Sequence, residues 1–156
     1  MTVLLQEFLA RQGPCFDVRS PKEFQHSHIP GAISLPLFTD EERALVGTAY
    51  KQQGKDIAVR LGIKCIGPKL DSLLSQALEH IGSNKTAKVY CWRGGMRSGF
   101  MRYFLDFAGI PSLQLQGGYK AYRRIALSTL TQPWCPFVIG GLTGSGKTQV
   151  LQALSQ

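Results

Sequence analysis

Closely spaced cysteines and long apolar runs are absent from this sequence, and each absence excludes a class of protein. The four cysteines, Cys15, Cys65, Cys91 and Cys135, lie far apart and form no CxxC pair. We therefore expect neither a disulfide framework nor a zinc site. No stretch of about 18 apolar residues is present, which argues against a membrane-spanning helix. The N-terminus has no basic stretch followed by an apolar block, so we expect no signal peptide and a cytoplasmic location.

Acidic residues are scarce in the second part of the chain. Residues 1–50 hold four Lys or Arg and six Asp or Glu, a balance of −2, whereas residues 51–156 have a balance of +10. From Lys85 onward, Asp106 is the only acid, against nine basic residues. Such a field attracts polyanions, with nucleic acid as the leading candidate, although a basic face can also simply keep a domain in solution.

Strand patterns alternate with helical patterns along most of the chain. Lys69–Ile81 has one continuous apolar face and is the clearest helix, and Gly62 is expected to end a shorter helix before it. Strands are expected at residues 15–18, 33–35, 87–90 and 113–115, and helices at 3–10, 43–51, 56–61, 69–81, 98–108 and 119–130. The alternation favours an α/β fold with a parallel sheet flanked by helices, in one domain over residues 1–132.

A cysteine loop joins the strand expected at 87–90 to the following helix. Residues 91–97 read Cys-Trp-Arg-Gly-Gly-Met-Arg. The Cys91 thiol would face backbone N–H groups and the positive end of a helix dipole, and both favour the nucleophilic thiolate. Two glycines in the loop would turn successive amides inward to form an anion-binding nest, which Arg97 would close. The alternative is a buried structural cysteine before a glycine turn.

A second glycine-rich loop lies close to the C-terminus. Residues 141–148 satisfy GxxxxGK[ST], with an apolar run at 137–140 that predicts a strand and a helical pattern at 149–155. The residues expected to hold phosphate or magnesium are Gly141, Gly144, Gly146, Lys147 and Thr148. Because only eight residues follow this loop, we interpret residues 133–156 as the start of an incomplete P-loop domain. Nucleotide and Mg²⁺ binding are expected only in a longer protein.

Several segments together resemble a known family. Residues 17–24 (DVRSPKEF) and 28–32 (HIPGA) resemble the N-terminal signature of rhodanese domains, and residues 115–122 (LQGGYKAY) resemble their C-terminal signature. With CWRGGMRS at 91–98, GTAYKQQG at 47–54 and the P-loop, the chain resembles the tRNA 2-selenouridine synthase family over essentially its whole length. Within the first segment, Asp17 and Arg19 are expected to tie the loop to its neighbours by hydrogen bonds.

The resemblance implies a selenotransferase that replaces the sulfur of wobble 2-thiouridine in tRNA with selenium, with Cys91 as the catalytic cysteine. The selenium would come from selenophosphate made by a partner enzyme, and the reaction would pass through S-geranylated tRNA formed with geranyl diphosphate. The residues implied to hold selenophosphate or a cysteine-bound chalcogen are Trp92, Arg93, Gly94, Gly95, Met96 and Arg97. The basic residues that we expect to contact RNA phosphates are Lys51, Arg123 and Arg124, with a solvated surface as the alternative.

Three other functions stay open on the sequence. The spacing from Cys91 to Arg97 is that of the CX5R cysteine phosphatases, although Tyr90 stands where those enzymes usually have histidine. A plain thiosulfate sulfurtransferase would use the same cysteine. The third alternative is not an enzyme but an inactive fragment that binds tRNA.

Overall fold

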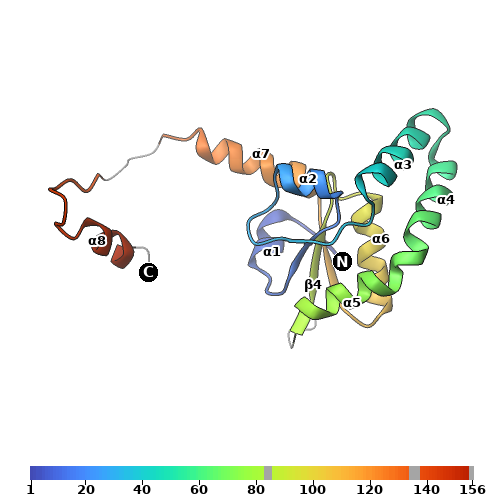
Figure 1. Ribbon diagram of the computed structural model, residues 1–156, viewed down its shortest axis with the longest axis horizontal. Helices are drawn as coiled ribbons and strands as arrows, with labels where there is room; N and C mark the ends of the chain where they lie inside the picture. Colours follow the sequence, from blue (N-terminus) through green and yellow to red (C-terminus); the bar gives the residue numbers. More distant parts are fainter. Residues whose placement is uncertain (83–85, 134–137, 155–156) are drawn as a thin grey trace.

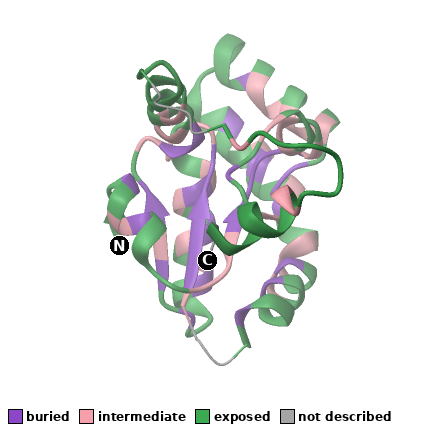
Figure 2. Cartoon of the chain, turned by 90° about the vertical axis from the view of Figure 1, so that its left-hand side faces the viewer, coloured by how far each residue is buried: buried purple, intermediate pink, exposed green. Residues whose placement is uncertain are grey.

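Within the described residues, five parallel strands form one sheet. The computed structural model describes residues 1–82, 86–133 and 138–154. The strands, in the spatial order β1-β5-β4-β2-β3, are β1 (Thr2–Val3), β5 (Ser112–Leu115), β4 (Ala87–Tyr90), β2 (Cys15–Asp17) and β3 (Ile33–Ser34). All four residues of β4 are buried, as expected for the central strand of a parallel sheet covered on both faces. Figure 2 shows this buried centre between helices that are mostly exposed on their outer sides.

Helices cover both faces of the sheet (Figure 1). The helices of the described residues, not all of which lie on the sheet, are α1 (Leu5–Ala10), α2 (Pro21–His26), α3 (Asp40–Gln52), α4 (Lys55–Ile66), α5 (Leu70–Ile81), α6 (Met96–Phe107), α7 (Gly118–Leu130) and α8 (Lys147–Leu154), with a 3₁₀ turn at Gly67–Lys69. Residues of α4, α5 and α6 form one apolar core with β2 and β4, whereas α1 and the start of α7 contribute to a second core. The predicted α/β fold with a parallel sheet is confirmed.

The antiparallel pair of α3 and α4 projects from the sheet and provides one wall of the site described below (Figure 1). A capping box begins α3: the Glu42 amide donates to Thr39 Oγ1 at 3.2 Å, and the Thr39 amide donates to the Glu42 carboxylate at 2.8 Å. The prediction that a helix ends at Gly62 was wrong, because α4 continues to Ile66. Gly62 lies in close contact with the ring of Phe38, where an added Cβ would be 3.4 Å from Cζ. Close packing there outweighs the low helix propensity of glycine.

Two ends of the chain differ from the sequence predictions. The helix predicted from residue 3 begins at Leu5, and Val3 instead belongs to the strand Thr2–Val3, which pairs with Gln114 and Leu115 at the edge of the sheet. A two-residue strand is too short to show an alternating pattern. Near the C-terminus, residues 138–140 form no strand, and the rest of that predicted strand, Phe137, lies outside the described residues. A strand needs a neighbour to pair with, and the described residues provide none beside this segment.

In the described part of the chain, no helix combines the length and apolarity needed to cross a membrane. The three described cysteines, Cys15, Cys65 and Cys91, form no disulfide. Cys135 lies outside the described residues.

Candidate active site

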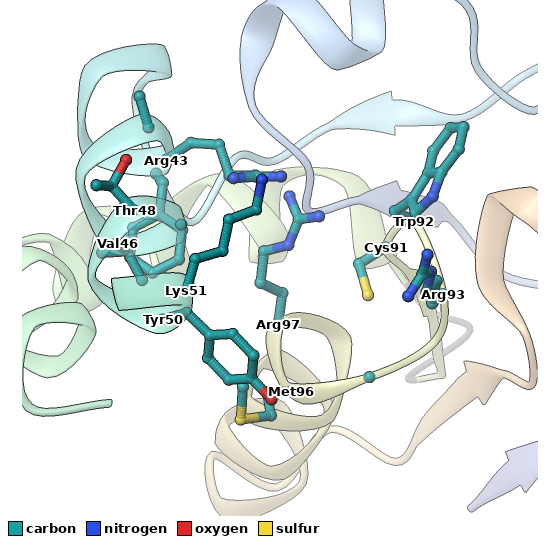
Figure 3. Close-up of a pocket in the computed structure, with 14 residues that line it drawn as sticks. Arg43, Val46, Thr48, Tyr50, Lys51, Cys91, Trp92, Arg93, Met96 and Arg97 are labelled. Atoms are coloured by element: carbon teal, nitrogen blue, oxygen red, sulfur yellow. The ribbon is translucent and has the colours of Figure 1, made fainter. Parts of the chain in front are cut away.

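Cys91 follows the last residue of β4, at the carboxyl end of the central strand. Its side chain is buried, and Figure 3 shows its Sγ on the concave side of the loop that runs through Trp92 and Arg93 to Met96. Sγ and the Oγ of Ser98 share a hydrogen bond at 3.1 Å. Helix α6 begins at Met96, two residues earlier than predicted, and this places Ser98 on its first turn.

The cysteine loop is shaped by close contact with the turn between β5 and α7. The amides of Tyr119 and Lys120 donate to the carbonyls of Cys91 and Trp92 at 2.9 and 3.0 Å. Gly94 has a φ of +65°, and an added Cβ would collide with the carbonyl oxygen of Leu115. Only glycine fits this left-handed position against a neighbouring backbone.

Gln114, a buried residue of β5, holds the cysteine loop in place through hydrogen bonds from its side chain. Its Nε2 donates to the Gly94 carbonyl at 2.7 Å and to Ser98 Oγ at 2.9 Å. No local pattern indicated this role, since a glutamine in a strand pattern does not predict hydrogen bonds to residues about 20 positions away. The amide fixes both the loop backbone and the hydroxyl that contacts the thiol.

The backbone N–H groups of residues 92–97 make no hydrogen bond to any described protein group. Such unpaired donors in a glycine-rich turn, ahead of a helix N-terminus, are the components of an anion-binding nest. An anion bound within the curve of the loop would accept hydrogen bonds from those N–H groups that point into it. The structure is therefore compatible with the predicted nest.

The thiol opens on a pocket of about 810 Å³ between the cysteine loop and α3. Four cationic side chains are among its described lining residues, namely Arg43, Lys51, Arg93 and Arg97, whereas Asp and Glu are absent from that lining. This excess of positive charge favours an anionic ligand beside the thiol. It also leaves the described pocket wall without a carboxylic acid to donate a proton.

Arg97 does line the pocket, but its guanidinium is already paired with a carboxylate. Arg97 Nη1 donates to Glu23 Oε2 at 2.7 Å, and Arg43 Nε lies 3.8 Å from the same oxygen. Burial alone would raise the pKa of Glu23, but the hydrogen bond from Arg97 and the two positive charges hold that pKa below its ordinary value. Arg97 is thus a fixed wall of the pocket, oriented by a residue of α2 that the sequence did not identify as part of the site.

Other predicted site residues are distributed around the pocket. The ring of Trp92 is half-buried and packs against Tyr119, with the ring centroids 5.8 Å apart. Met96 is 52% exposed on the pocket rim. Arg123 and Arg124 are exposed on α7 and do not line the pocket, so of the three predicted RNA contacts only Lys51 lies beside Cys91.

The P-loop residues form a separate feature that does not line this pocket. Lys147 Nζ donates to the carbonyls of Gly141 and Leu142 at 2.9 and 2.6 Å. Gly144 and Gly146 adopt positive φ values of +85° and +77°. The lysine therefore lies over the backbone of its own loop, at the start of α8.

Two residues of the expected N-terminal signature form a buried ion pair that reaches the C-terminal signature. Arg19 Nη2 donates to Asp17 Oδ2 at 2.6 Å and to the Ser27 carbonyl at 2.6 Å. The Arg19 guanidinium also lies 4.3 Å from the ring centroid of Tyr119. The predicted role of Asp17 and Arg19 in tying the first loop to its neighbours is confirmed.

The family model described as "Rhodanese-like domain" matches residues 3–125. The chain belongs to this family. It is also similar to proteins named tRNA 2-selenouridine synthase: 43% identical over 146 residues to that of Nitrosomonas europaea and 41% identical over 153 residues to that of Pseudomonas fluorescens. These matches cover 91% and 96% of this chain but only 38% and 42% of the relatives, so the chain spans about two fifths of their length.

A solved structure agrees with this assignment of the rhodanese-like fold. The crystal structure of the N-terminal domain of a "putative ATP/GTP binding protein" from Clostridium difficile 630 is 38% identical, with a TM-score of 0.75. The match covers 81% of this chain and 99% of that one. Both the rhodanese signatures and the resemblance to tRNA 2-selenouridine synthases are confirmed as predicted.

Proposed function

We propose that this chain is the rhodanese-like part of a tRNA-modifying transferase that replaces the sulfur of wobble 2-thiouridine with selenium, and that Cys91 is its catalytic residue. The observation that carries the proposal is the Cys91 thiol at the end of β4, facing a pocket lined by four cations. The names of the relatives support the choice of reaction and of tRNA as substrate. The proposed compartment is the cytoplasm, because the substrate is tRNA.

The pocket suits the transfer of a chalcogen from an anionic donor. In the proposed step, the Cys91 thiolate attacks the phosphorus of selenophosphate, the bond from phosphorus to selenium breaks, and selenium leaves with the electron pair as selenide. The selenide then displaces the geranyl thiolate from C2 of the S-geranylated uridine, and water hydrolyses the phosphoryl group on Cys91. Loop amides and Arg93 would stabilise the phosphoryl oxygens during the first attack. Selenophosphate would come from a separate supplier enzyme.

Two further elements follow from the family resemblance and belong to the same proposal. Geranyl diphosphate would be a co-substrate that forms S-geranylated tRNA as the intermediate. The P-loop residues, with Lys147 and Thr148, would bind a phosphate-bearing ligand with Mg²⁺ in a longer protein. Neither of these residues lines the Cys91 pocket, so the two sites would act on different groups.

The described lining of the pocket disfavours cysteine-phosphatase chemistry. A phosphatase needs an acid to protonate the leaving alkoxide, and Asp and Glu are absent from the described lining residues. Glu23, the carboxylate that contacts two of the lining arginines, is held ionised by Arg97. Thiosulfate sulfurtransfer needs no such acid, because sulfite leaves as a stable anion.

The test is to measure 2-selenouridine by nucleoside mass spectrometry after incubating the protein with 2-thiouridine tRNA, selenophosphate and geranyl diphosphate. Wild type, Cys91→Ser and Cys65→Ser are compared, because Cys65 is a half-buried cysteine of α4 outside the pocket. We expect Cys91→Ser to abolish the product and Cys65→Ser to retain it.

Parallel assays distinguish the alternatives. Equal product from Cys91→Ser and wild type would contradict the proposed role of the thiol. Cysteine-dependent thiocyanate formation from thiosulfate and cyanide, without any 2-selenouridine, would favour the sulfurtransferase. Cysteine-dependent hydrolysis of p-nitrophenyl phosphate would favour the phosphatase. Binding of tRNA with no reaction of Cys91 would favour the inactive fragment.

A further inference from the structure

Three residues on α3 form a strip that faces the cysteine loop. Arg43, Gly47 and Lys51 are spaced four residues apart, which places them on one side of the helix. All three line the pocket that holds Cys91. Figure 3 shows the charged ends of Arg43 and Lys51 pointing into the pocket from the wall opposite the thiol.

Gly47 leaves room for the guanidinium of Arg43. A Cβ built on Gly47 would collide with Arg43 Nη1 and lie 3.7 Å from Arg43 Cζ. Gly47 is in the interior of a helix, where glycine is a poor choice unless the missing side chain is needed. The position of the Arg43 head group is therefore tied to the glycine one turn further along.

The charges of this strip are not neutralised within the described protein. Arg43 Nε is buried without a hydrogen-bond partner among the described residues, and its nearest carboxylate oxygen, on Glu23, is 3.8 Å away. That carboxylate already accepts hydrogen bonds from Arg97 at 2.7 Å and from the Ser20 amide at 3.1 Å. Lys51 has neither an ion pair nor a hydrogen bond in the described part of the chain. Two cations therefore face the pocket, and Glu23, the carboxylate nearest to Arg43, is already hydrogen-bonded to other groups.

The pocket is also larger than a chalcogen donor requires. At about 810 Å³, it falls in the range of sites that enclose a ligand of the size of a nucleotide. A tetrahedral oxyanion held by the cysteine loop would fill only the end beside Cys91. The α3 end would stay open to a second group.

We propose that Arg43 and Lys51 form a second phosphate subsite, which holds a phosphate group of the acceptor while the cysteine loop holds the donor. Gly47 positions Arg43 in this subsite. The inference rests on the proposed function, because a second ligand is needed only if selenium released at Cys91 passes to an acceptor. The phosphate would come either from the RNA backbone or from a small-molecule diphosphate, since the two present the same chemistry to a pair of cations.

The experiment measures binding of two probes, a 2-thiouridine anticodon stem-loop RNA and inorganic pyrophosphate, by calorimetry at several salt concentrations. The variants are Arg43→Gln, Lys51→Gln and Gly47→Ala. The controls are Lys55→Gln and Arg60→Gln, which remove exposed cations from α4 of the same helix pair without touching the pocket lining. In a separate experiment, peptide mass spectrometry of the wild-type protein measures whether Cys91 is modified by selenophosphate.

We expect Arg43→Gln and Lys51→Gln each to weaken binding of one probe about tenfold, as for the loss of a charge-assisted hydrogen bond. The slope of log Kd against the logarithm of the salt concentration should decrease by about 1 for each variant, which corresponds to one lost phosphate contact. Gly47→Ala should weaken the same probe although alanine favours the helix, whereas both controls should bind as wild type. Weaker binding of the RNA alone identifies the RNA backbone as the source of the bound phosphate. Weaker binding of pyrophosphate identifies a small-molecule diphosphate as the source.

Two results would distinguish failure of the proposed phosphate subsite from failure of the proposed function. Unchanged affinity of both probes for Arg43→Gln and Lys51→Gln, or an equal loss in the α4 controls, would overturn the subsite. Absence of any reaction between Cys91 and the selenium donor, with binding still dependent on Arg43 and Lys51, would overturn the proposed function and support the subsite.

Discussion

The Sγ of Cys91 lies 3.1 Å from the Oγ of Ser98, on the first turn of α6. The same Oγ accepts a hydrogen bond from Gln114 Nε2 at 2.9 Å. The Ser98 hydroxyl has one proton, for which Cys91 Sγ at 3.1 Å and the Gly95 carbonyl at 3.3 Å are the two acceptors. An ionised sulfur is the stronger acceptor because it is charged. We therefore propose Ser98 as a positioning residue for Cys91.

Ser98→Ala should slow alkylation of Cys91 by iodoacetamide at neutral pH about tenfold, because a hydrogen bond to a charged group is lost. Ser112→Ala is the matched control, since Ser112 is a buried serine whose Oγ donates to the Ile110 carbonyl, away from the loop. Peptide mass spectrometry over time gives both rates. Equal rates for Ser98→Ala and wild type would show that the hydroxyl does not act on the sulfur.

Gly94→Ala and Gly95→Ala should differ sharply although the residues are adjacent. Gly94 has a φ of +65° and its added Cβ would meet the backbone of β5 and its following turn, whereas a Cβ on Gly95 would meet nothing within 4 Å. We expect Gly94→Ala to lower the free energy of unfolding by about 2 kcal/mol or more. Gly95→Ala should change it by less than about 1 kcal/mol. Urea unfolding measures both, and comparable losses would mean that the loop is not held against β5 as described.

The ion pair between Glu23 and Arg97 should contribute to stability in a pH-dependent way. Because the pKa of Glu23 is lowered in the folded state, its contribution is present above the ordinary value of 4.5 and is lost as the pH falls through the lower folded value. Glu23→Gln should therefore be less stable than wild type at pH 7 by about 1 kcal/mol, and the difference should shrink in strong acid.

Glu7→Gln serves as the control for that prediction. Glu7 pairs with Arg11 at 3.3 Å, but both side chains are well exposed, so its removal should have little effect at any pH. Urea unfolding from pH 3 to pH 7 would measure both variants. A loss in Glu23→Gln that is as large at pH 3 as at pH 7 would contradict the account.

Cys15 should be unreactive at pH values where Cys91 is alkylated. Burial raises the pKa of the Cys15 thiol to about 12, although Lys88 partly opposes the shift. Below that value the folded protein keeps Cys15 neutral, whereas an unfolded chain would ionise it near 9.0. Stability should therefore fall as the pH rises from about 9 toward 12, and Cys15→Ala should reduce this fall. Peptide mapping that finds Cys15 alkylated as fast as Cys91 at pH 8 would be the contrary result.

The sequence predicted the elements whose signals are local. The apolar face of residues 69–81 predicted α5 (Leu70–Ile81), and the β-branched and aromatic run at 87–90 predicted β4. The capping box that begins α3 is likewise local, since Thr39 and Glu42 are three residues apart. The position of Cys91 at the end of a strand followed from these local patterns, and the fold class followed from their alternation.

Features that depend on tertiary contacts were missed or mistaken. Gly62 looked like a helix end because its contact with Phe38 comes from another segment. The pairing of Arg97 with Glu23 joins residues 74 positions apart, and no local signal predicts it. Arg43 was overlooked as part of the site, although its spacing from Gly47 and Lys51 on a predicted helix was visible in the sequence.

The central claim is that the Cys91 thiolate reacts with its anionic selenium donor. Mass spectrometry of the cysteine peptides after exposure to selenophosphate tests it most directly. The account predicts a phosphoryl adduct on the Cys91 peptide that is absent from the Cys15 and Cys65 peptides. Formation of 2-selenouridine in tRNA while the Cys91 peptide stays unmodified throughout turnover would contradict it.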